Sequence, residues 1–425
     1  MPRYTRRQLA VLLLLVAAAM LNPLCLALAP VALVFLVGYS YTKYFTWASH
    51  WILGLTDGMA AVGGWIAVTG RVEPPALVLW FALTAWIAGF DLLYACQDVD
   101  FDRAHGLHSV PARFGVAAAL RWARVHHALT ALALADILTE VGLPEGTLSV
   151  LPGPGSSVAG ALISDPRVAK ISFTGSTEVG TQVMRAAAEN IARVSLELGG
   201  KSANIVFADA DLDTCVESSV WSVFDNAGQD CCARSRAFIQ RPIYEEFVER
   251  FAERTASIAV GDPLDESTEM GPLISEGQRR TSLEYIEIGL QEGARKVTGG
   301  DVPEGPGFFL RPTVLADVDN RWRVAQEEIF GPVACMIPFD SEEEVVRLAN
   351  DTVYGLSGSI WTQNLGRAIR VAKAIRTGVL SVNSSSSVHT EAPFGGYKRS
   401  GIGREMGMHA VNLYTEVKNV YFSEV

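Results

Sequence analysis

The first part of the chain is apolar in long runs that are almost free of charged residues. A helix needs about 20 apolar residues to cross the hydrocarbon core of a bilayer. The runs of this kind are Leu9–Met20, Leu24–Val37, Trp47–Val68 and Ala76–Tyr94. The last two are long enough alone, although Asp57 interrupts one of them, whereas residues 9–37 form one long span or two short ones broken near Asn22. The pattern predicts an all-α transmembrane segment that binds membrane lipid.

The start of the chain also fits a second interpretation. Arg3, Arg6 and Arg7 precede an apolar run with small residues at Ala17 and Ala19, as in a cleaved signal peptide. Further apolar spans follow, so an integral, multi-pass membrane segment fits better. The basic flanks at 3–7 and 113–124 favour the cytoplasmic side, which predicts a cytoplasmic C-terminal part.

The hydrophobic period changes near residue 135. Short β-like runs then alternate with helical patterns, and such alternation is typical of βαβ units and a mainly parallel sheet. The β-like runs followed by helical ones are VAKISF (168–173), ANIVF (203–207) and RAFIQ (236–240). The region 341–382 shows the same alternation of strand-like and helical segments. An Ala/Leu-rich helix, predicted over 121–138, runs from one composition into the other without a polar linker. The second part is therefore predicted to be an α/β protein.

Charge separates the two parts as well. The chain to Ala135 has 9 Lys+Arg and 6 Asp+Glu, and the remainder has 26 and 40, so the net charge of −11 arises in the second part. Nucleic-acid binding needs a basic face, and an acidic α/β part argues against that class. The six cysteines show neither paired disulfide spacing nor zinc spacing, which favours a reduced setting.

Cys231, in GQDCCARSR (228–236), is the leading candidate for a nucleophile. A free cysteine is most often a small buried apolar residue, but two adjacent cysteines in a Gly-Gln-Asp turn are poor core packing. Glu197, in LELGGK (196–201), is a candidate base, although alone it reads as a solvated carboxylate at a strand end. FTGSTEVG (173–180) ends a strand and opens a helix, whose backbone N–H groups are suited to a phosphate.

Together these stretches closely resemble the NAD(P)-dependent aldehyde dehydrogenase superfamily. The matching motifs cover about residues 129–425 in the family's order: FTGS (173–176), LELGGK (196–201), FDNAGQDC (224–231), EEIFGPV (327–333) and PFGGYKRSGIGRE (393–405). The resemblance implies oxidation of a small-molecule aldehyde, with NAD or NADP as cofactor. It leaves open which aldehyde and which of the two cofactors.

The resemblance also implies a role for each site residue. Cys231, two residues after Gln229, would attack the aldehyde carbonyl, and hydride would pass to the nicotinamide to leave a thioester. Glu197 would activate the water that hydrolyses this thioester. The residues implied in cofactor binding are Gly175 and Ser176 by the pyrophosphate, Leu198, Glu328 on the nicotinamide ribose, and Phe330 near the cofactor. Asn226 and Gly228 would shape the cysteine loop.

The region that resembles this family lacks the family's N-terminal third. That third carries a Pro-Trp-Asn segment whose asparagine completes the oxyanion hole, residues of the adenosine ribose site and the opening strands of the cofactor sheet. Loss of one oxyanion-hole donor costs about 100- to 1,000-fold in rate. We therefore expect an incomplete Rossmann-like cofactor sheet and impaired oxidation.

A second resemblance covers about residues 8–133. YSYTKYFTWASHWILGL (39–55), AVGGWIAVTG (61–70) and the Asp-rich stretch 91–109 resemble UbiA-type aromatic prenyltransferases such as the 4-hydroxybenzoate polyprenyltransferases of quinone biosynthesis. Asp98 and Asp102 match the family's second Asp-rich motif and would bind Mg²⁺-diphosphate, as carboxylates do. The same carboxylates also fit a solvated loop between spans. The family's first Asp-rich motif is absent.

We thus expect a prenyltransferase-like fragment over 1–133 joined to an aldehyde dehydrogenase-like region over 134–425. In the latter, 134–200 and part of the C-terminal region would bind cofactor, 201–400 would be mainly catalytic, and 406–425 would give a strand to a homo-oligomer. The leading activity is aldehyde oxidation; the alternatives are membrane prenyl transfer and an inactive hybrid formed by recombination or misassembly near LTALALA (129–135).

Overall fold

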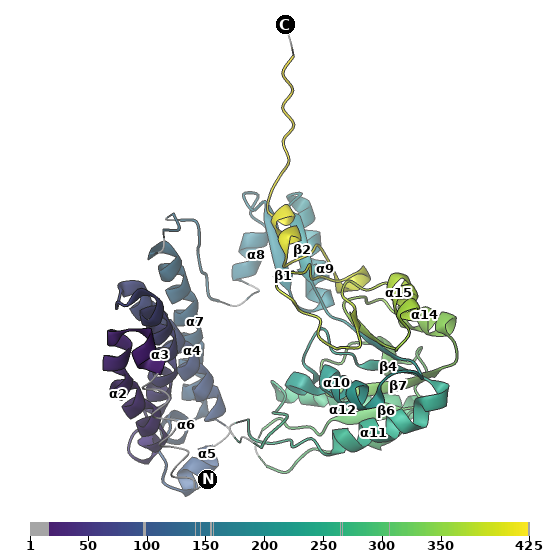
Figure 1. Ribbon diagram of the computed structural model, residues 1–425, viewed down its shortest axis with the longest axis horizontal. Helices are drawn as coiled ribbons and strands as arrows, with labels where there is room; N and C mark the ends of the chain where they lie inside the picture. Colours follow the sequence, from purple (N-terminus) through teal and green to yellow (C-terminus); the bar gives the residue numbers. More distant parts are fainter. Residues whose placement is uncertain are drawn as a thin grey trace. The chain divides into compact units, whose positions relative to one another are not determined.

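The computed structural model describes residues 17–96, 99–140, 142–144, 146–153, 155, 157–263, 265, 267–305 and 307–423. The chain forms two compact units, Met1–Pro154 and Gly155–Val425. The division falls within the Pro/Gly-rich stretch 151–157, C-terminal of the predicted family boundary, because one helix continues through residue 133 (Figure 1).

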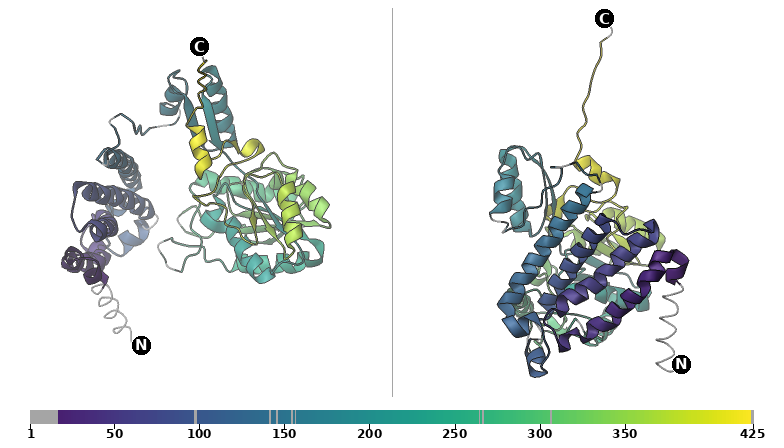
Figure 2. Two further views of the ribbon diagram at one scale, coloured as in Figure 1. Left: turned by 45° about the horizontal axis from the view of Figure 1, so that its top comes forward. Right: turned by 90° about the vertical axis from the view of Figure 1, so that its left-hand side faces the viewer.

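The first unit is all-α. Its helices are α2 (Pro23–Gly38), the 3₁₀ helix η1 (Tyr39–Tyr44), α3 (Ser49–Thr69), α4 (Pro74–Tyr94), α5 (Val99–Ala104), α6 (Val110–Phe114) and α7 (Val116–Glu140). Helices α3, α4 and α7 lie side by side, with α4 packed against both of the others (Figure 2). The close approach of α3 to α4 requires glycine at Gly54, where a Cβ atom would lie 2.4 Å from the Thr84 carbonyl oxygen.

Three helical segments of this unit are long and apolar enough to cross a membrane: Pro23–Tyr44, Ser49–Thr69 and Pro74–Leu93. They correspond to three of the predicted apolar runs; residues 9–16 of the first run lie outside the described residues. The predicted transmembrane helical segment is therefore confirmed as a helical unit with three candidate spans.

The second unit holds two sheets. Its strands are β1 (Lys170–Thr174), β2 (Arg193–Glu197), β3 (Ala203–Val206), β4 (Arg236–Gln240), β5 (Arg295–Thr298), β6 (Thr313–Ala316), β7 (Val333–Phe339), β8 (Gly358–Trp361), β9 (Ser381–Val382) and β10 (Gly401–Ile402). The larger sheet has the order β5-β6-β7-β4-β3-β8-β9, with only β5 antiparallel to its neighbour. The smaller sheet has the order β1-β2-β10. The predicted α/β class is confirmed.

Helices connect these strands (Figure 1). They are α8 (Val158–Ile163), α9 (Thr177–Glu189), α10 (Leu212–Phe224), α11 (Tyr244–Ala256), α12 (Glu276–Glu292), α13 (Arg323–Gln326), α14 (Glu342–Asn350) and α15 (Leu365–Ala374), with 3₁₀ turns η2 (Asp225–Gly228), η3 (Arg241–Ile243), η4 (Lys398–Ser400) and η5 (Met408–Leu413). Helix α9 packs on the small sheet with α8 against it, and α10, α11 and α12 are among those that pack on the large sheet. Helix α11 shows why the pattern works: Phe247, Phe251 and Thr255, four residues apart, are all buried on one face.

The small sheet is an open one. Within the described residues β1 pairs with β2 alone, so its outer edge has no strand beside it. The segment 414–423, which follows η5, forms no strand with the rest of the chain and is largely exposed. Its predicted role in a partner's sheet stays a prediction.

A buried cation holds the large sheet to its surroundings. The Arg236 guanidinium, on β4, donates to the Lys201 carbonyl oxygen (2.9 Å), the Asn320 Oδ1 atom (2.9 Å) and the Ala349 carbonyl oxygen (3.1 Å). Only 1% of Arg236 is exposed. A buried acceptor that loses its donor costs about 1–3 kcal/mol.

We predict that Arg236→Ala lowers the free energy of unfolding by about 3 kcal/mol or more, because it leaves several buried acceptors without a donor. Urea-dependent proteolysis of the full chain in detergent measures this. Arg241→Ala is the matched control, since the Arg241–Asp340 ion pair is exposed and exposed pairs contribute little to stability. Equal losses in the two variants would contradict the prediction.

Candidate active site

The first part of the site lies where β1 and β2 end. Thr174 on β1 is in register with Glu197 on β2, and the Gly175 N–H donates to the Glu197 carbonyl oxygen at 3.1 Å. Ser176 caps α9, and its hydroxyl accepts from the Val179 N–H at 3.3 Å. Gly175 and Ser176 are exposed at the N-terminus of a 13-residue helix. Backbone N–H groups at such an end attract anions.

The link from β2 to β3 has no space for a side chain at Gly199 or at Gly200. A Cβ atom on Gly199 would lie 1.7 Å from the Glu328 Oε2 atom, so the carboxylate occupies that space. The Gly200 N–H donates to the Glu328 Oε1 atom at 3.1 Å. Leu198, just before, is buried and packs against Gly180 of α9. This link therefore brings Glu328 beside the end of β2.

Glu328 and Phe330 belong to one irregular segment before β7. Phe330 has a positive φ of 56° and is 40% exposed. The Gln278 side chain on α12 donates to the Ile329 and Phe330 carbonyl oxygens at 2.8 and 2.9 Å. Burial raises the pKa of Glu328 above its usual range, and the Gly200 N–H opposes that rise.

The cysteine loop follows α10. Asn226, Ala227 and Gly228 are consecutive residues with positive φ angles of 49°, 55° and 73°. The Asn226 side chain donates to the Gln229 carbonyl oxygen at 3.0 Å, and the Gln229 side chain accepts from the Ile274 N–H at 2.9 Å. These bonds stabilise a turn with positive φ angles, a backbone conformation that is strained for most residues other than glycine and asparagine.

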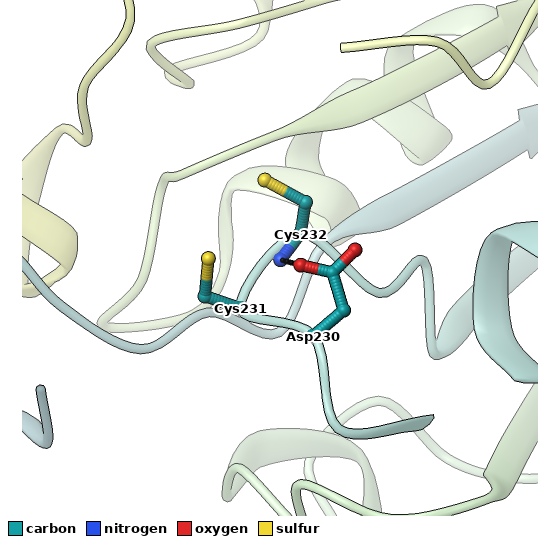
Figure 3. Close-up of side chains that lie close together, drawn as sticks. All are labelled: Asp230, Cys231 and Cys232. Atoms are coloured by element: carbon teal, nitrogen blue, oxygen red, sulfur yellow. Dashed lines mark hydrogen bonds between the residues drawn. The ribbon is translucent and has the colours of Figure 1, made fainter. Parts of the chain in front are cut away.

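The loop presents two thiols in different surroundings. Cys231 is half-buried, Cys232 is buried, and Figure 3 shows Asp230 accepting a hydrogen bond from the Cys232 N–H, at 2.9 Å. The Cys231 carbonyl oxygen lies against Gly200, where a Cβ atom would be 2.6 Å away. The cysteine loop and the β2–β3 link are therefore in direct contact.

The two thiols influence each other's ionisation. The Cys231 hydrogen bond and the charge of Arg234 lower the pKa of Cys232, whereas the Cys232 thiol and burial raise the pKa of Cys231. The physical cause is that adjacent thiolates repel, so the pair loses one proton far more readily than two. In the resting pair Cys232 is therefore the thiol that ionises more readily, whereas Cys231 is the thiol that is more accessible.

Glu197 is placed as a base. It is 6% exposed, and neither carboxylate oxygen has a hydrogen-bond partner. Burial, followed by the charge of Glu405, raises the pKa of Glu197 to about 8, Arg404 opposes that rise, and Cys232 adds to it. A carboxyl group with such a pKa can accept a proton near neutral pH.

Sequence reasoning did not assign Arg404 and Glu405. Both belong to the quoted motif PFGGYKRSGIGRE, and β10 within that motif pairs with Glu197 and Leu196. The motif itself indicated that these residues matter, but the sequence did not show that β10 pairs with β2, which brings Arg404 and Glu405 close to Glu197. A Cβ atom on Gly395 would lie 2.9 Å from Glu197 Oε1 and 3.1 Å from the Arg404 guanidinium.

The predicted magnesium site is described only in part. Asp98 lies outside the described residues. Asp102, on α5, has a side chain that is 1% exposed, with the Lys43 Nζ atom 3.8 Å from Oδ1 and no hydrogen-bond partner on Oδ2. Elsewhere in this unit the buried His50 contacts the half-buried Asp91 at 2.6 Å and accepts from the Val110 N–H at 3.1 Å, a contact that sequence reasoning missed.

Two family models match the chain. The aldehyde dehydrogenase family model matches residues 124–420, and the UbiA prenyltransferase family model matches residues 7–167. The two matches overlap over 124–167, which contains the predicted join.

Curated relatives match the second part. Mouse retinaldehyde dehydrogenase 3 is 48% identical over 293 residues, covering 69% of this chain and 57% of its own length. The betaine aldehyde dehydrogenase of Sinorhizobium fredii is 47% identical over 296 residues, 69% of this chain and 61% of its own. The chain thus spans about three fifths of the relatives it matches.

Solved structures agree with these relatives. A double mutant of Staphylococcus aureus betaine aldehyde dehydrogenase in complex with NAD⁺ aligns with a TM-score of 0.65 and 37% identity, covering 70% of this chain and 63% of that one. An NAD⁺ complex of Bacillus cereus aldehyde dehydrogenase aligns with a TM-score of 0.65 and 39% identity, covering 71% and 64%. Through residues 124–420, the chain belongs to the aldehyde dehydrogenase family.

Proposed function

We propose that the second unit performs NAD(P)-dependent oxidation of an aldehyde to a carboxylic acid, with Cys231 as nucleophile and Glu197 as base. One observation carries the proposal: Glu197, buried and with both carboxylate oxygens unpartnered, ends the strand that leads into the Gly-rich link, and the Cys231 carbonyl oxygen lies against that link at Gly200. The membership of the aldehyde dehydrogenase family supports it.

The residues present fit a nicotinamide cofactor at two points. The exposed N-terminus of α9, with Gly175 and Ser176, suits the pyrophosphate, and Glu328 is held by the Gly200 N–H with a carboxylate available for ribose hydroxyls. Leu198 and Phe330 would pack beside it. When bound, the cofactor supplies the acceptor for the substrate's hydride.

The chain's own groups would handle the protons and the acyl group. The Cys231 sulfur forms a bond to the aldehyde carbonyl carbon, and its thiol proton leaves for the neighbouring Cys232 thiolate or solvent. Once the substrate is a thioester, Glu197 takes a proton from water as the water oxygen attacks the acyl carbon. The C–S bond breaks, and the acid leaves while the Cys231 thiolate is restored.

Oxidation is proposed to be weaker than hydrolysis in this chain. Oxidation needs a complete cofactor site, yet the small sheet has three strands and an open edge at β1 in the described residues. Ester hydrolysis needs only the thiol and Glu197. An inactive hybrid is the limiting case of the same argument.

A second candidate function is membrane prenyl transfer by the first unit. The UbiA family match and the buried, partly unpartnered Asp102 favour it. Asp98 and Asp102 would hold Mg²⁺ and a diphosphate. Mg²⁺-dependent transfer of a prenyl group to 4-hydroxybenzoate by the full chain tests it, with Asp102→Asn as the variant expected to lose it.

We further propose a multi-pass protein with its second unit in the cytoplasm, and a homo-oligomer. The exposed residues after η5, including Val417, Tyr421 and Phe422, offer apolar surface for a partner strand. The basic residues flanking the apolar spans support the orientation.

We predict that a thiol alkylator modifies Cys231 before Cys232 and Cys215, because Cys231 is half-buried and the other two are buried. Peptide mass spectrometry after brief labelling measures the order. Cys231→Ser should remove the first modification, and earlier labelling of Cys232 would refute the assignment of the nucleophile.

We predict that hydrolysis of p-nitrophenyl acetate exceeds NAD(P)H formation from aldehydes on one preparation. Cys231→Ala should abolish hydrolysis. Oxidation at about 1 per second or more, a typical enzyme rate, would show that the open sheet does not impair the cofactor site.

We predict that the deacylation rate rises with pH and levels off above about pH 8, because Glu197 accepts a proton only when ionised and its pKa is raised to about 8. Glu197→Gln should lower deacylation by about 100- to 10,000-fold and remove this pH dependence. Stopped-flow separation of acylation from deacylation measures both. Glu269→Gln, an exposed glutamate far along the chain, is the control. An unchanged pH profile in Glu197→Gln would exclude Glu197 as the base.

We predict that the full chain stays in the membrane pellet through high-salt and carbonate washes, since three apolar helices are long enough to span a bilayer. Immunoblotting of pellet and supernatant measures this, with a peripheral protein as the washed-off control. N-terminal sequencing that shows loss of the first apolar run would favour the signal-peptide interpretation instead.

A further inference from the structure

The cysteine loop gathers three metal-ligating side chains at one point. One ligand atom each from Asp230, Cys231 and Cys232 lies within 4.8 Å of the others, and Figure 3 shows both thiols and the carboxylate on the same turn. Asp230 is exposed, Cys231 half-buried and Cys232 buried. The group therefore has one side open to an ion from solvent.

The turn that carries these ligands is held from several sides. The hydrogen bond from the Cys232 N–H to Asp230 Oδ1 uses one carboxylate oxygen, and the other takes no part in that bond. Gly228 lies tightly against the Gly331 carbonyl oxygen, and the Cys231 carbonyl lies against Gly200. A ligand set on such a turn needs little ordering when an ion binds.

The size of the group suits a tetrahedral ion. Zinc–sulfur bonds of about 2.3 Å at tetrahedral angles place two sulfur atoms about 3.8 Å apart. The ligand atoms of the two thiols and the carboxylate lie within 4.8 Å of one another. Side-chain rotations that shift these atoms by about 1 Å would bring them to that spacing. Thiolate sulfur is a soft ligand, which favours Zn²⁺ and similar ions over Mg²⁺.

Charged groups of both signs lie around the cysteine pair. Glu197 is buried, and neither of its carboxylate oxygens has a hydrogen-bond partner. Arg234 and Arg404 are the opposing cations: the Arg234 guanidinium donates to the Cys232 carbonyl oxygen at 3.1 Å, and that of Arg404 to the Gly396 and Gly403 carbonyl oxygens at 3.1 and 2.6 Å. A divalent ion would offset the repulsion between two adjacent thiolates.

We propose that Asp230, Cys231 and Cys232 form a binding site for a thiophilic divalent cation such as Zn²⁺, which blocks the cysteine nucleophile while bound. Two thiol protons pass to solvent, two metal–sulfur bonds and one metal–oxygen bond form, and water completes the coordination. No electron transfer is involved. The binding site stands on the geometry, whereas the blocking of a nucleophile rests on the proposed function.

Cadmium binding tests the site without substrate. The full chain in detergent, stripped with a chelator, is titrated with Cd²⁺ while the ultraviolet thiolate-to-cadmium charge-transfer band is recorded. We expect one Cd²⁺ per chain, with affinity reduced more than tenfold in Cys231→Ser and in Cys232→Ser and less in Asp230→Asn. Cys215→Ser, which removes a buried thiol elsewhere, is the matched control and should bind as the original chain does.

Two outcomes would overturn the site. A charge-transfer band that survives in both Cys231→Ser and Cys232→Ser places the ion elsewhere. A stoichiometry of one Cd²⁺ per two chains shows that the thiols bridge copies of the chain, so that the loop alone does not hold the ion.

Zinc inhibition tests the consequence separately. Zn²⁺ should suppress ester hydrolysis and alkylation of Cys231, and a chelator should restore both. Protection of Cys231 from alkylation in a chain that shows no hydrolysis would support the metal site and reject the proposed function. Full hydrolysis with Zn²⁺ saturating the site would reject the blocking.

Discussion

The second unit depends on a backbone constraint at Gly199 and Gly200. The chain passes there from the small sheet to the large one. The Glu328 carboxylate lies against Gly199, and the Cys231 carbonyl oxygen lies against Gly200. A side chain on either glycine would displace Glu328 or the cysteine loop. The two candidate functions of this region, holding a ribose and presenting a thiol, are therefore fixed to each other by the absence of two Cβ atoms.

Burial without hydrogen bonds gives Glu197 its chemical character. A carboxylate in water has its charge stabilised by solvent, and Glu197 has neither solvent nor a donor. Its neighbours divide by sign, since Glu405 disfavours its charge and Arg404 favours it. All three are brought together by pairing of β10 with β2, although more than 200 positions separate Glu197 from Glu405 in the sequence.

Sequence reasoning reached the fold class and the apolar helices because both depend on local periodicity. The strand RAFIQ could be read from its short apolar run, and the helix α11 from apolar residues spaced four apart. The unpartnered state of Glu197 could not, because it depends on which distant groups pack around one carboxylate. The same holds for the thiols: their order along the chain distinguished Cys231, but their unequal burial and ionisation follow from Arg234 and the loop geometry. The roles of the site residues stay predictions.

The open edge of β1 exposes the protein to pairing with other copies of itself. Its outer backbone groups meet no strand within the described residues, and Ile171 and Phe173 alternate with polar positions along it. Such an edge can template pairing with another chain, and Lys170 at its start opposes this only weakly. The amount of correctly folded material should then depend on synthesis rate and chaperone supply, so that gene dosage as well as sequence would govern how much of the protein a cell accumulates.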